Sequence, residues 1–432
     1  MAEIKTKKYK ISNPYESVAH LLENAENHYK TNLHTHSTYS DAELSMAEMI
    51  EGFYDNDFDI LAFTDHGILG KEWDKEPRKV PLFYYQSLLG KKRRCLTTQQ
   101  YREVLSGEYK TTANKRTKKR GMQCVPDCIE ANMLVYMLNH VNGFFTDTSC
   151  ENVFGKENDY DEPLARIEAS GGISHINHPT DVFQARNNPD CCEKKENVEF
   201  FARLFRKYKS CVGMEVLNTC DVFSPCDRIL WDKLLQILLP ESRRMVWGFS
   251  NSDAHKLSEI DASFMDFILP EYSLQNLRSA MENGTFFSIS RYAKNELGKD
   301  FAGKGVYPSV NSVVVDNENG TITVRGKNCD SVQWISNGEI IQTDDEKENG
   351  EINSTISVNN YSDKITCYIR AQLKGPGGIC FTQPFICDDG NMESYRQPPF
   401  VPEKLTKKEK RRKEFYNTRI GAIINKRKMN KV

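Results

Sequence analysis

The feature that most constrains this chain is the grouping of its histidines into short segments, each following a strand-like run. Six of the nine histidines lie in four such segments, and two of the segments also contain an aspartate. Imidazole and carboxylate groups are the ligands that hold Zn²⁺, Mn²⁺ and Fe²⁺ while leaving positions for water. The grouping therefore indicates a multi-metal hydrolytic site. The segments are His34-Thr35-His36, Asp65-His66-Gly67, His175-Ile176-Asn177-His178 and Asp253-Ala254-His255.

The region around these segments has the pattern of repeated βα units. From residue 29 to about 292, short apolar runs alternate with amphipathic stretches, as in an α/β protein. Ser45 and Glu48 form a capping-box pattern ahead of one expected helix. The candidate ligands come at or just after the ends of the apolar runs, where α/β barrels build their active sites. The runs are residues 58–63, 172–174, 212–217 and 245–249.

Beyond about residue 305 the pattern changes to strands. Asn337-Gly338 is a strong signal for a two-residue hairpin, and residues 365–373 alternate between apolar and polar. Residues 305–395 are therefore expected to form a small all-β immunoglobulin-like sandwich. Residues 1–28 read as a mostly helical lead-in. The tail at 396–432 is basic, with 12 Lys/Arg against 3 Glu from residue 403 onward.

A long polar insertion at 71–125 interrupts the βα pattern and carries two basic clusters, at 91–94 and 115–120. After a strand-end ligand, such an insertion could serve as a lid or substrate-binding cap. Solvated surface charge is the alternative, and the sequence leaves both open.

Length, charge and composition set the wider limits. A chain of 432 residues can form a large domain plus a smaller one. A net charge of −2 predicts no overall attraction to nucleic acid or membrane. No apolar run reaches the roughly 20 residues of a membrane span, and the charged first ten residues lack the apolar core of a secretion signal. We therefore expect a cytoplasmic protein whose 13 cysteines are reduced thiols.

The spacing within the segments suggests how metal ions would be shared. Residues two apart on a strand point to the same side, so His34 and His36 can bind one ion together. Asp41 follows at a loop distance from which it can reach a neighbouring ion. In the second segment, His66 is assigned to metal and Asp65 to orienting a ligand. The same-side rule also applies to Asp253 and His255.

Other residues have less definite roles. His175 either lines the site or packs in the core. Asn177, Glu215 and Asn251 are candidates for supporting the ligands or contacting substrate. Tyr39 either donates a hydrogen bond at the rim or packs inside.

Taken in order, the segments resemble the motifs of the PHP (polymerase and histidinol phosphatase) family. Residues 34–41 match its HxHxxxSD motif, Thr64-Asp65-His66 its TDH motif, His178-Pro179 its His-Pro motif, and residues 252–255 its SDAH motif. The resemblance covers roughly residues 29–292. It implies a distorted (β/α)₇ TIM-like barrel over residues 29–300, with up to three divalent metal ions (Mn²⁺, Zn²⁺ or Fe²⁺).

The resemblance further implies a bridging glutamate and one more histidine between the second and third motifs. Glu130 and His140 are the best matches, although Asp127-Cys128-Ile129 stands where the family often has Pro-Gly and an apolar residue. By this match, the first ion would take His34, His36, Glu130 and Asp253, the second Glu130, His140 and His178, and the third Asp41, His66 and His255.

Such a cluster suits phosphate-ester hydrolysis, because water between two metal ions loses a proton more easily and becomes a nucleophile. We expect a metal-dependent phosphoesterase in which Asp65, His178 and Arg291 take part in catalysis. Arg291 would contact the phosphate; a surface salt bridge is the alternative. The substrate is either a nucleotide or short oligonucleotide phosphodiester, which the basic insertion slightly favours, or a phosphorylated small molecule.

Two other classes of function stay open. One is a metal-dependent hydrolase of a non-phosphate bond. The other is a non-catalytic binding module that contacts a protein partner through the β-sandwich.

Overall fold

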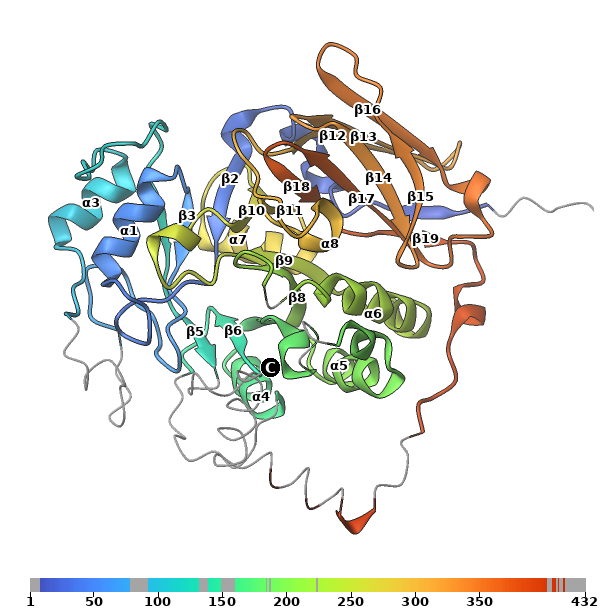
Figure 1. The fold of residues 1–432 in the computed structure, drawn as a ribbon, viewed down its shortest axis with the longest axis horizontal. Helices are drawn as coiled ribbons and strands as arrows, with labels where there is room; N and C mark the ends of the chain where they lie inside the picture. The colour runs from blue at the N-terminus through green and yellow to red at the C-terminus, as the bar shows by residue number, and fades with distance from the viewer. Residues whose placement is uncertain are drawn as a thin grey trace, which may run out of the picture.

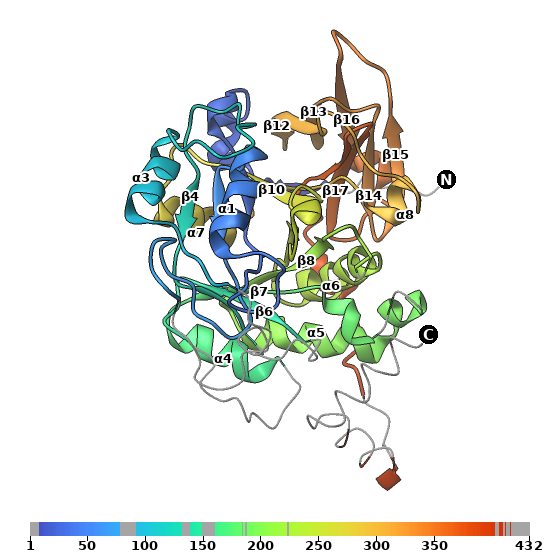
Figure 2. The same cartoon turned by 60° about the vertical axis from the view of Figure 1, so that its left-hand side comes forward.

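The computed structural model describes most of the chain, and the polypeptide forms a mixed α/β fold with several sheets (Figures 1 and 2). Lys91 and part of the basic insertion lie outside the described residues. The described residues are 8–77, 92–131, 139–148, 160–183, 185, 188–222, 224–401, 406–408, 411 and 415.

Two sheets carry the histidine segments. In the first, β2 (His28–Asn32), β3 (Ile60–Ala62) and β4 (Gln123–Val125) pair in parallel. The second has the order β5-β6-β7-β8-β9, with parallel pairing from β7 to β9 and antiparallel pairing from β5 to β7. Its strands are β5 (Cys128–Ala131), β6 (Val141–Phe144), β7 (Ile173–Ile176), β8 (Cys211–Asn218) and β9 (Trp247–Asn251).

The helices follow local sequence signals. The predicted capping box is confirmed at α1 (Met46–Asp55), where Ser45 and Glu48 satisfy each other's backbone N–H groups. In Figure 1, α1 and α3 (Thr98–Ser106) lie on the left, α4 (Asp161–Ala169) lies below β6, and α5 (Lys195–Lys207) and α6 (Asp227–Ser242) lie to the right of β8. The remaining helices are α7 (Leu274–Asn283) and α8 (Lys294–Leu297).

The predicted (β/α)₇ barrel is not seen as a closed barrel among the described strands. A closed barrel needs a continuous ladder between neighbouring strands, whereas the two sheets are joined by the isolated bridges Thr35–Ala254 and His66–Glu130. Both bridges lie in segments that carry candidate metal ligands. The reason for the opening is local, because β3, β4 and β5 are only three or four residues long and the chain then turns into these segments.

The C-terminal strands form antiparallel sheets (orange in Figure 1), and one of them continues the first sheet. β18 pairs with β11 (Phe286–Ser290), which pairs with β10 (Ser263–Ile268), which in turn pairs with β2. The joined strands are β14 (Ser331–Ser336), β15 (Glu339–Asp344), β17 (Tyr368–Gly375), β18 (Gly378–Phe381) and β19 (Phe385–Asp388). The separate three-stranded sheet comprises β12 (Ser309–Asp316), β13 (Thr321–Lys327) and β16 (Glu351–Ser357).

The turn predicted at Asn337-Gly338 is confirmed. Ser336 pairs with Glu339, and both turn residues have positive φ (54° and 82°), as a two-residue hairpin requires. The strand expected from residue 365 begins three residues later, with β17. In the described N-terminal segment, β1 (Lys10–Ser12) pairs with β19 and precedes two 3₁₀ helices, Glu16–Leu21 and Ala25–Asn27. Among the described residues, no helix is long and apolar enough to cross a membrane.

A buried ion pair joins α6 to the C-terminal sheet. The Arg370 guanidinium on β17 donates two hydrogen bonds to the Asp232 carboxylate on α6, at 3.0 and 2.7 Å, and the Tyr368 hydroxyl donates a third at 2.7 Å. All three side chains are buried. The helix beside β8 is thus held against the C-terminal strands by directional contacts as well as by apolar packing.

Candidate metal centre

Eight of the nine predicted ligands lie just before, on or just after a strand of the two sheets, and Asp41 lies in the loop between β2 and α1. His34 and His36 follow β2, His66 follows β3, and Glu130 is on β5. After His66, the positive φ of Gly67 (66°) allows a turn in which the Gly67 N–H donates to the Glu130 carbonyl oxygen at 2.8 Å. The other ligands are His140 directly before β6, His178 after β7, and Asp253 and His255 after β9.

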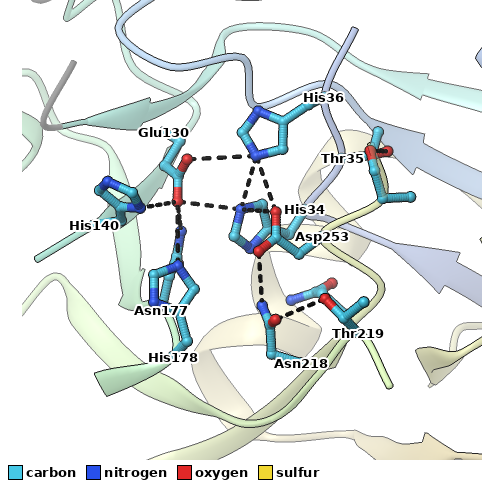
Figure 3. A network of polar contacts seen from close by, with 12 residues as sticks. His34, Thr35, His36, Glu130, His140, Asn177, His178, Asn218, Thr219 and Asp253 are labelled. Carbon is cyan, nitrogen blue, oxygen red and sulfur yellow. Dashed lines mark hydrogen bonds and ion pairs between the residues drawn. The ribbon is translucent and has the colours of Figure 1, made fainter. Parts of the chain in front are cut away.

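Glu130 contacts several histidines of the cluster, and Figure 3 shows its carboxylate facing His34, His36 and His140. It is buried, and its two carboxylate oxygens lie within 3.8 Å of ring nitrogens from five histidines. The nearest distances are 2.6 Å to His66 Nδ1, 3.1 Å to His140 Nδ1, 3.2 Å to His34 Nε2, 3.4 Å to His36 Nε2 and 3.8 Å to His178 Nε2.

Two aspartates complete the cluster on its other sides. Asp253 Oδ1 lies 3.2 Å from His34 Nε2 and 3.1 Å from His36 Nε2. Asp41 Oδ1 lies 3.2 Å from His255 Nε2. All nine predicted ligands are therefore brought together from segments spread over more than 200 residues of sequence.

Three groups within the cluster could hold a metal ion, because their ligand atoms lie within 4.8 Å of one another. They share members, and their composition differs from the sets that the family resemblance implies: His36 joins the Asp41 set, and His66 also joins Glu130 and His140. His178 and Asp253 belong to none of the three. The groups are His36, Asp41, His66 and His255; His34, His36 and Glu130; and His66, Glu130 and His140.

The polar atoms of the cluster suit bound cations. His34 Nε2 and His36 Nε2 face each other at 3.2 Å. Glu130 Oε2 and Asp253 Oδ1 are buried and accept no hydrogen bond from the described residues. Burying such oxygens without a donor costs about 1–3 kcal/mol each, and more for charged groups. Divalent ions bound by these nitrogens and oxygens would remove that cost, so the donor set fits them.

The electrostatics of the cluster agree with this fit. Burial, together with the neighbouring imidazoles of His255 and His66, lowers the pKa of His36 to about 4. Burial alone would raise the pKa of Glu130, but the surrounding histidines hold it well below its usual range. Burial also lowers the pKa of His178 and of His255, yet adjacent carboxylates raise both to about 9. The cluster thus attracts positive charge, and divalent ions would displace the protons.

Asp65 holds the loop that carries Asp41. Its carboxylate accepts hydrogen bonds from the backbone N–H groups of Ser37 (2.8 Å) and Ser40 (3.1 Å) and from both serine hydroxyls. The Ser40 hydroxyl lies 3.1 Å from His36 Nδ1. Asp65 therefore reaches the cluster through Ser40.

A layer of asparagines supports the ligands from behind. Asn177 donates to Glu130 Oε1 at 2.7 Å and to Asn142 Oδ1 at 2.9 Å. The Asn32 amide donates to the His34 carbonyl oxygen at 2.9 Å. Sequence reasoning missed Asn32, Asn142 and Asn218. A signal was present, because an asparagine lies within two residues of His34, His140, His178 and Asp253.

Other predicted site residues have different surroundings. Arg291 forms the salt bridge that the sequence had left as the alternative, since its guanidinium lies 2.6 Å from Asp261 and donates to the carbonyl oxygens of Gly305 and Gly377. His175 is buried and stacks on Phe249, with ring centroids 4.6 Å apart. This packing is the core role that the sequence allowed.

Tyr39 is also buried, with its hydroxyl 3.2 Å from the Cys95 thiol. Its role is therefore packing rather than hydrogen bonding at the rim.

The second basic cluster of the insertion is bound to the fold. Arg116 donates to the carbonyl oxygens of Tyr54 and Phe58, and Lys118 forms an ion pair with Asp59. The guanidinium of Arg120 lies over the Tyr29 ring. These three cations hold the segment against α1 and the start of β3.

The solved structures that are similar to this chain include two bacterial proteins. No protein-family model and no curated protein sequence matches the chain. One structure is a two-domain protein from Bacteroides vulgatus ATCC 8482 described as containing a predicted PHP-like metal-dependent phosphoesterase; it has 14% identity and a TM-score of 0.42, with 84% of this chain and 88% of that chain covered. The other is PsfC from Pseudomonas syringae PB-5123, with 16% identity and a TM-score of 0.32, covering 59% and 88%. The chain is thus similar in structure to a two-domain PHP-like protein, and it carries a buried histidine-rich cluster.

Proposed function

We propose that this protein is a metal-dependent phosphoesterase. The observation that carries the proposal is the convergence of five histidines on the buried carboxylate of Glu130, with two further acids and one more histidine around them. Divalent ions bound there would supply concentrated positive charge for a phosphate ester and would activate water. The chain's own residues supply the ligands and hold them in place. We further propose that up to three ions bind, of Mn²⁺, Zn²⁺ or Fe²⁺.

The exposure of the ligands supports one direction of substrate approach. The side chains of His34, His36 and Glu130 are at most 1% exposed, whereas His255 is 32% and Asp41 21% exposed. A phosphate ester therefore meets the cluster on the side of Asp41 and His255. The side chains of His34, His36 and Glu130 are shielded from solvent, which helps to keep their geometry.

The substrate is proposed to be a phosphorylated small molecule or a short nucleic acid. The basic insertion favoured the second class in the sequence, but Arg116, Lys118 and Arg120 are engaged by the fold and are not free to follow a phosphate backbone. The two classes are therefore to be separated by assay.

The finer fold assignment is also a proposal. We propose an open, distorted barrel for residues 29–300, followed by an immunoglobulin-like sandwich for 305–395. Support comes from the two bridges at the ligand segments and from the apolar side chains shared between the β12-β13-β16 sheet and β14-β17, such as Val324, Trp334 and Leu373.

The test combines metal analysis with a substrate panel. The full chain is purified without chelators, its metals are measured, and it is assayed with added Mn²⁺ on chromogenic phosphomonoesters and phosphodiesters, amides and lactones. We expect bound metal and hydrolysis of a phosphate ester, which His34→Ala and Asp253→Ala abolish. His20→Ala, which changes an exposed histidine outside the cluster, is the matched control.

Three outcomes would contradict the proposal. Full activity in both ligand variants would show that hydrolysis does not use the cluster. Turnover of amides or lactones alone would assign a different hydrolase. A folded protein with almost no metal and no activity would be a binding module.

A further inference from the structure

Glu215 is a buried acid on β8 with four hydrogen-bond donors around it. Its side chain is 0% exposed. Oε1 lies 2.8 Å from His34 Nδ1 and 3.0 Å from Asn251 Nδ2, and Oε2 accepts from the His178 backbone N–H at 3.0 Å and from Asn218 Nδ2 at 2.9 Å. The donors come from the ends of four strands, β2, β7, β8 and β9.

These contacts act on the metal centre from behind. A proton on His34 Nδ1, shared with Glu215, leaves the lone pair of Nε2 facing Glu130 and Asp253, each 3.2 Å away. The bond to the His178 N–H holds that residue at a positive φ of 26°, a conformation that costs a non-glycine residue energy. Asn218 also donates to Asp253 Oδ2 at 3.3 Å.

We infer that Glu215 is a positioning residue of the metal centre, which selects the tautomer of His34 and sets the place of His178 and, through Asn218, of Asp253. The inference rests on the proposed metal binding, but not on which bond the protein hydrolyses. In this role Glu215 contacts neither a metal ion nor the substrate itself. The carboxylate acts through three ligands at once.

The chemistry of the four neighbours explains why a carboxylate is needed. The Asn218 and Asn251 amides and the His178 N–H act as donors here, and a carboxylate accepts at both oxygens. In Glu215→Gln the new NH₂ group must replace one of the two oxygens. Either orientation places that NH₂ against two donors, so the substitution keeps the shape of the side chain while disrupting the alignment of His34 or of His178 and Asn218.

The alternative is that Glu215 serves stability alone, and Asp232 provides the matched control. Asp232 is also a buried acid with several donors, but they come from Arg370 and Tyr368 at the contact between α6 and β17. Asp232→Asn tests the general cost of altering such an acid. It leaves the groups around Glu130 in place.

The experiment titrates metal-free full-length protein with Mn²⁺ and follows free Mn²⁺ by electron paramagnetic resonance. We expect Glu215→Gln to weaken binding by about 10–100-fold, the usual effect of losing a group that orients a ligand. Asp232→Asn should bind Mn²⁺ with the affinity of the wild type, even if its melting temperature falls as far as that of Glu215→Gln. Glu215→Asp retains the charge at a shorter reach and should weaken binding by less than Glu215→Gln.

The results separate this inference from the proposed function. Wild-type Mn²⁺ affinity in Glu215→Gln overturns the inference; if that variant does not fold, wild-type affinity in Glu215→Asp overturns it. An equal loss of affinity in Asp232→Asn also overturns it, because a general loss of stability would then suffice. Wild-type protein that binds Mn²⁺ but hydrolyses no phosphate ester refutes only the phosphoesterase. Absence of Mn²⁺ binding in the wild type, together with absence of Zn²⁺ and Fe²⁺ in the metal analysis, refutes both.

Discussion

Replacing Asp65 separates a residue that holds a ligand loop from one that contacts substrate. Asp65→Ala removes the acceptor of two backbone N–H groups and two hydroxyls, from Ser37 and Ser40, all in buried positions. Each buried N–H left without a partner costs about 1–3 kcal/mol. The hydroxyls can rotate toward other acceptors. We therefore expect the free energy of unfolding to fall by about 3–5 kcal/mol.

Asp65→Asn provides a graded comparison. An amide oxygen in place of Oδ1 retains the three bonds from the Ser37 N–H, the Ser40 N–H and the Ser40 hydroxyl. The NH₂ group then faces the Ser37 hydroxyl, which can accept from it. The remaining difference is the lost negative charge of the acceptor, which should lower the free energy of unfolding by about 1–2 kcal/mol in total.

The assay pairs urea unfolding of the metal-free protein with Mn²⁺ titration. If Asp65 holds the loop, stability and Mn²⁺ affinity fall in the same order, wild type, Asp65→Asn, Asp65→Ala, because Asp41 and His36 depend on this loop. Loss of hydrolysis in Asp65→Ala with wild-type stability and wild-type Mn²⁺ affinity would refute the reasoning. Asp65 would then act on the substrate directly.

Three further predictions concern pH, an ion pair and metal removal. Burial lowers the pKa of His28, but Asp266 at 2.6 Å raises it to about 9. Because the pKa is higher in the folded than in the unfolded protein, His28 stabilises the fold fully below pH 6.5, and this stabilisation is lost as the pH rises to 9. The free energy of unfolding, measured with urea, should fall by at most about 3 kcal/mol between pH 6.5 and pH 9. His28→Gln should remove this fall; the same pH dependence in the variant and the wild type would contradict the prediction. Arg370→Met leaves the buried Asp232 with only the tyrosine donor and should lower the free energy of unfolding by about 3–5 kcal/mol. Adding Asp232→Leu to this variant should restore much of the lost stability. If the losses of the two single variants instead add up in the double variant, the two residues are not a coupled pair. Removal of metal by a chelator should lower the melting temperature, and Mn²⁺ should restore it; His34→Ala should show a smaller response than His20→Ala.

Much of the site could be predicted because its signals are local. The histidine segments follow apolar runs, and strand ends on one side of a sheet lie together in space. That alone brings His34 near His66 on the first sheet, and His178 near Asp253 on the second. The capping box at Ser45 and the turn at Asn337 likewise depend on a few adjacent residues. Each of these predictions needed only the period of a strand or the chemistry of a cap or turn.

The pairing between distant strands could not be read in this way. Residues from 305 onward looked separate because their pattern is all-β, yet Ile289 of β11 pairs with Cys380 of β18, so the two regions share a sheet. Nothing in either strand alone specifies its partner. The predicted distorted barrel is not seen as a continuous ladder for a similar reason, since ladder closure depends on several short strands whose ends diverge into the ligand segments.

The partners of Glu215 show the same limit on the scale of one residue. In a regular strand, Glu215 and Leu217 would point to the same side. The register shifts between these residues, so that Glu215 pairs with Phe249, Leu217 with Ser250 and Asn218 with Asn251. The extra residue of this irregularity turns Asn218 to the face of Glu215 and Leu217 away from it. Strand periodicity would have placed an apolar side chain beside the acid, whereas the structure places there the amide that links it to Asp253.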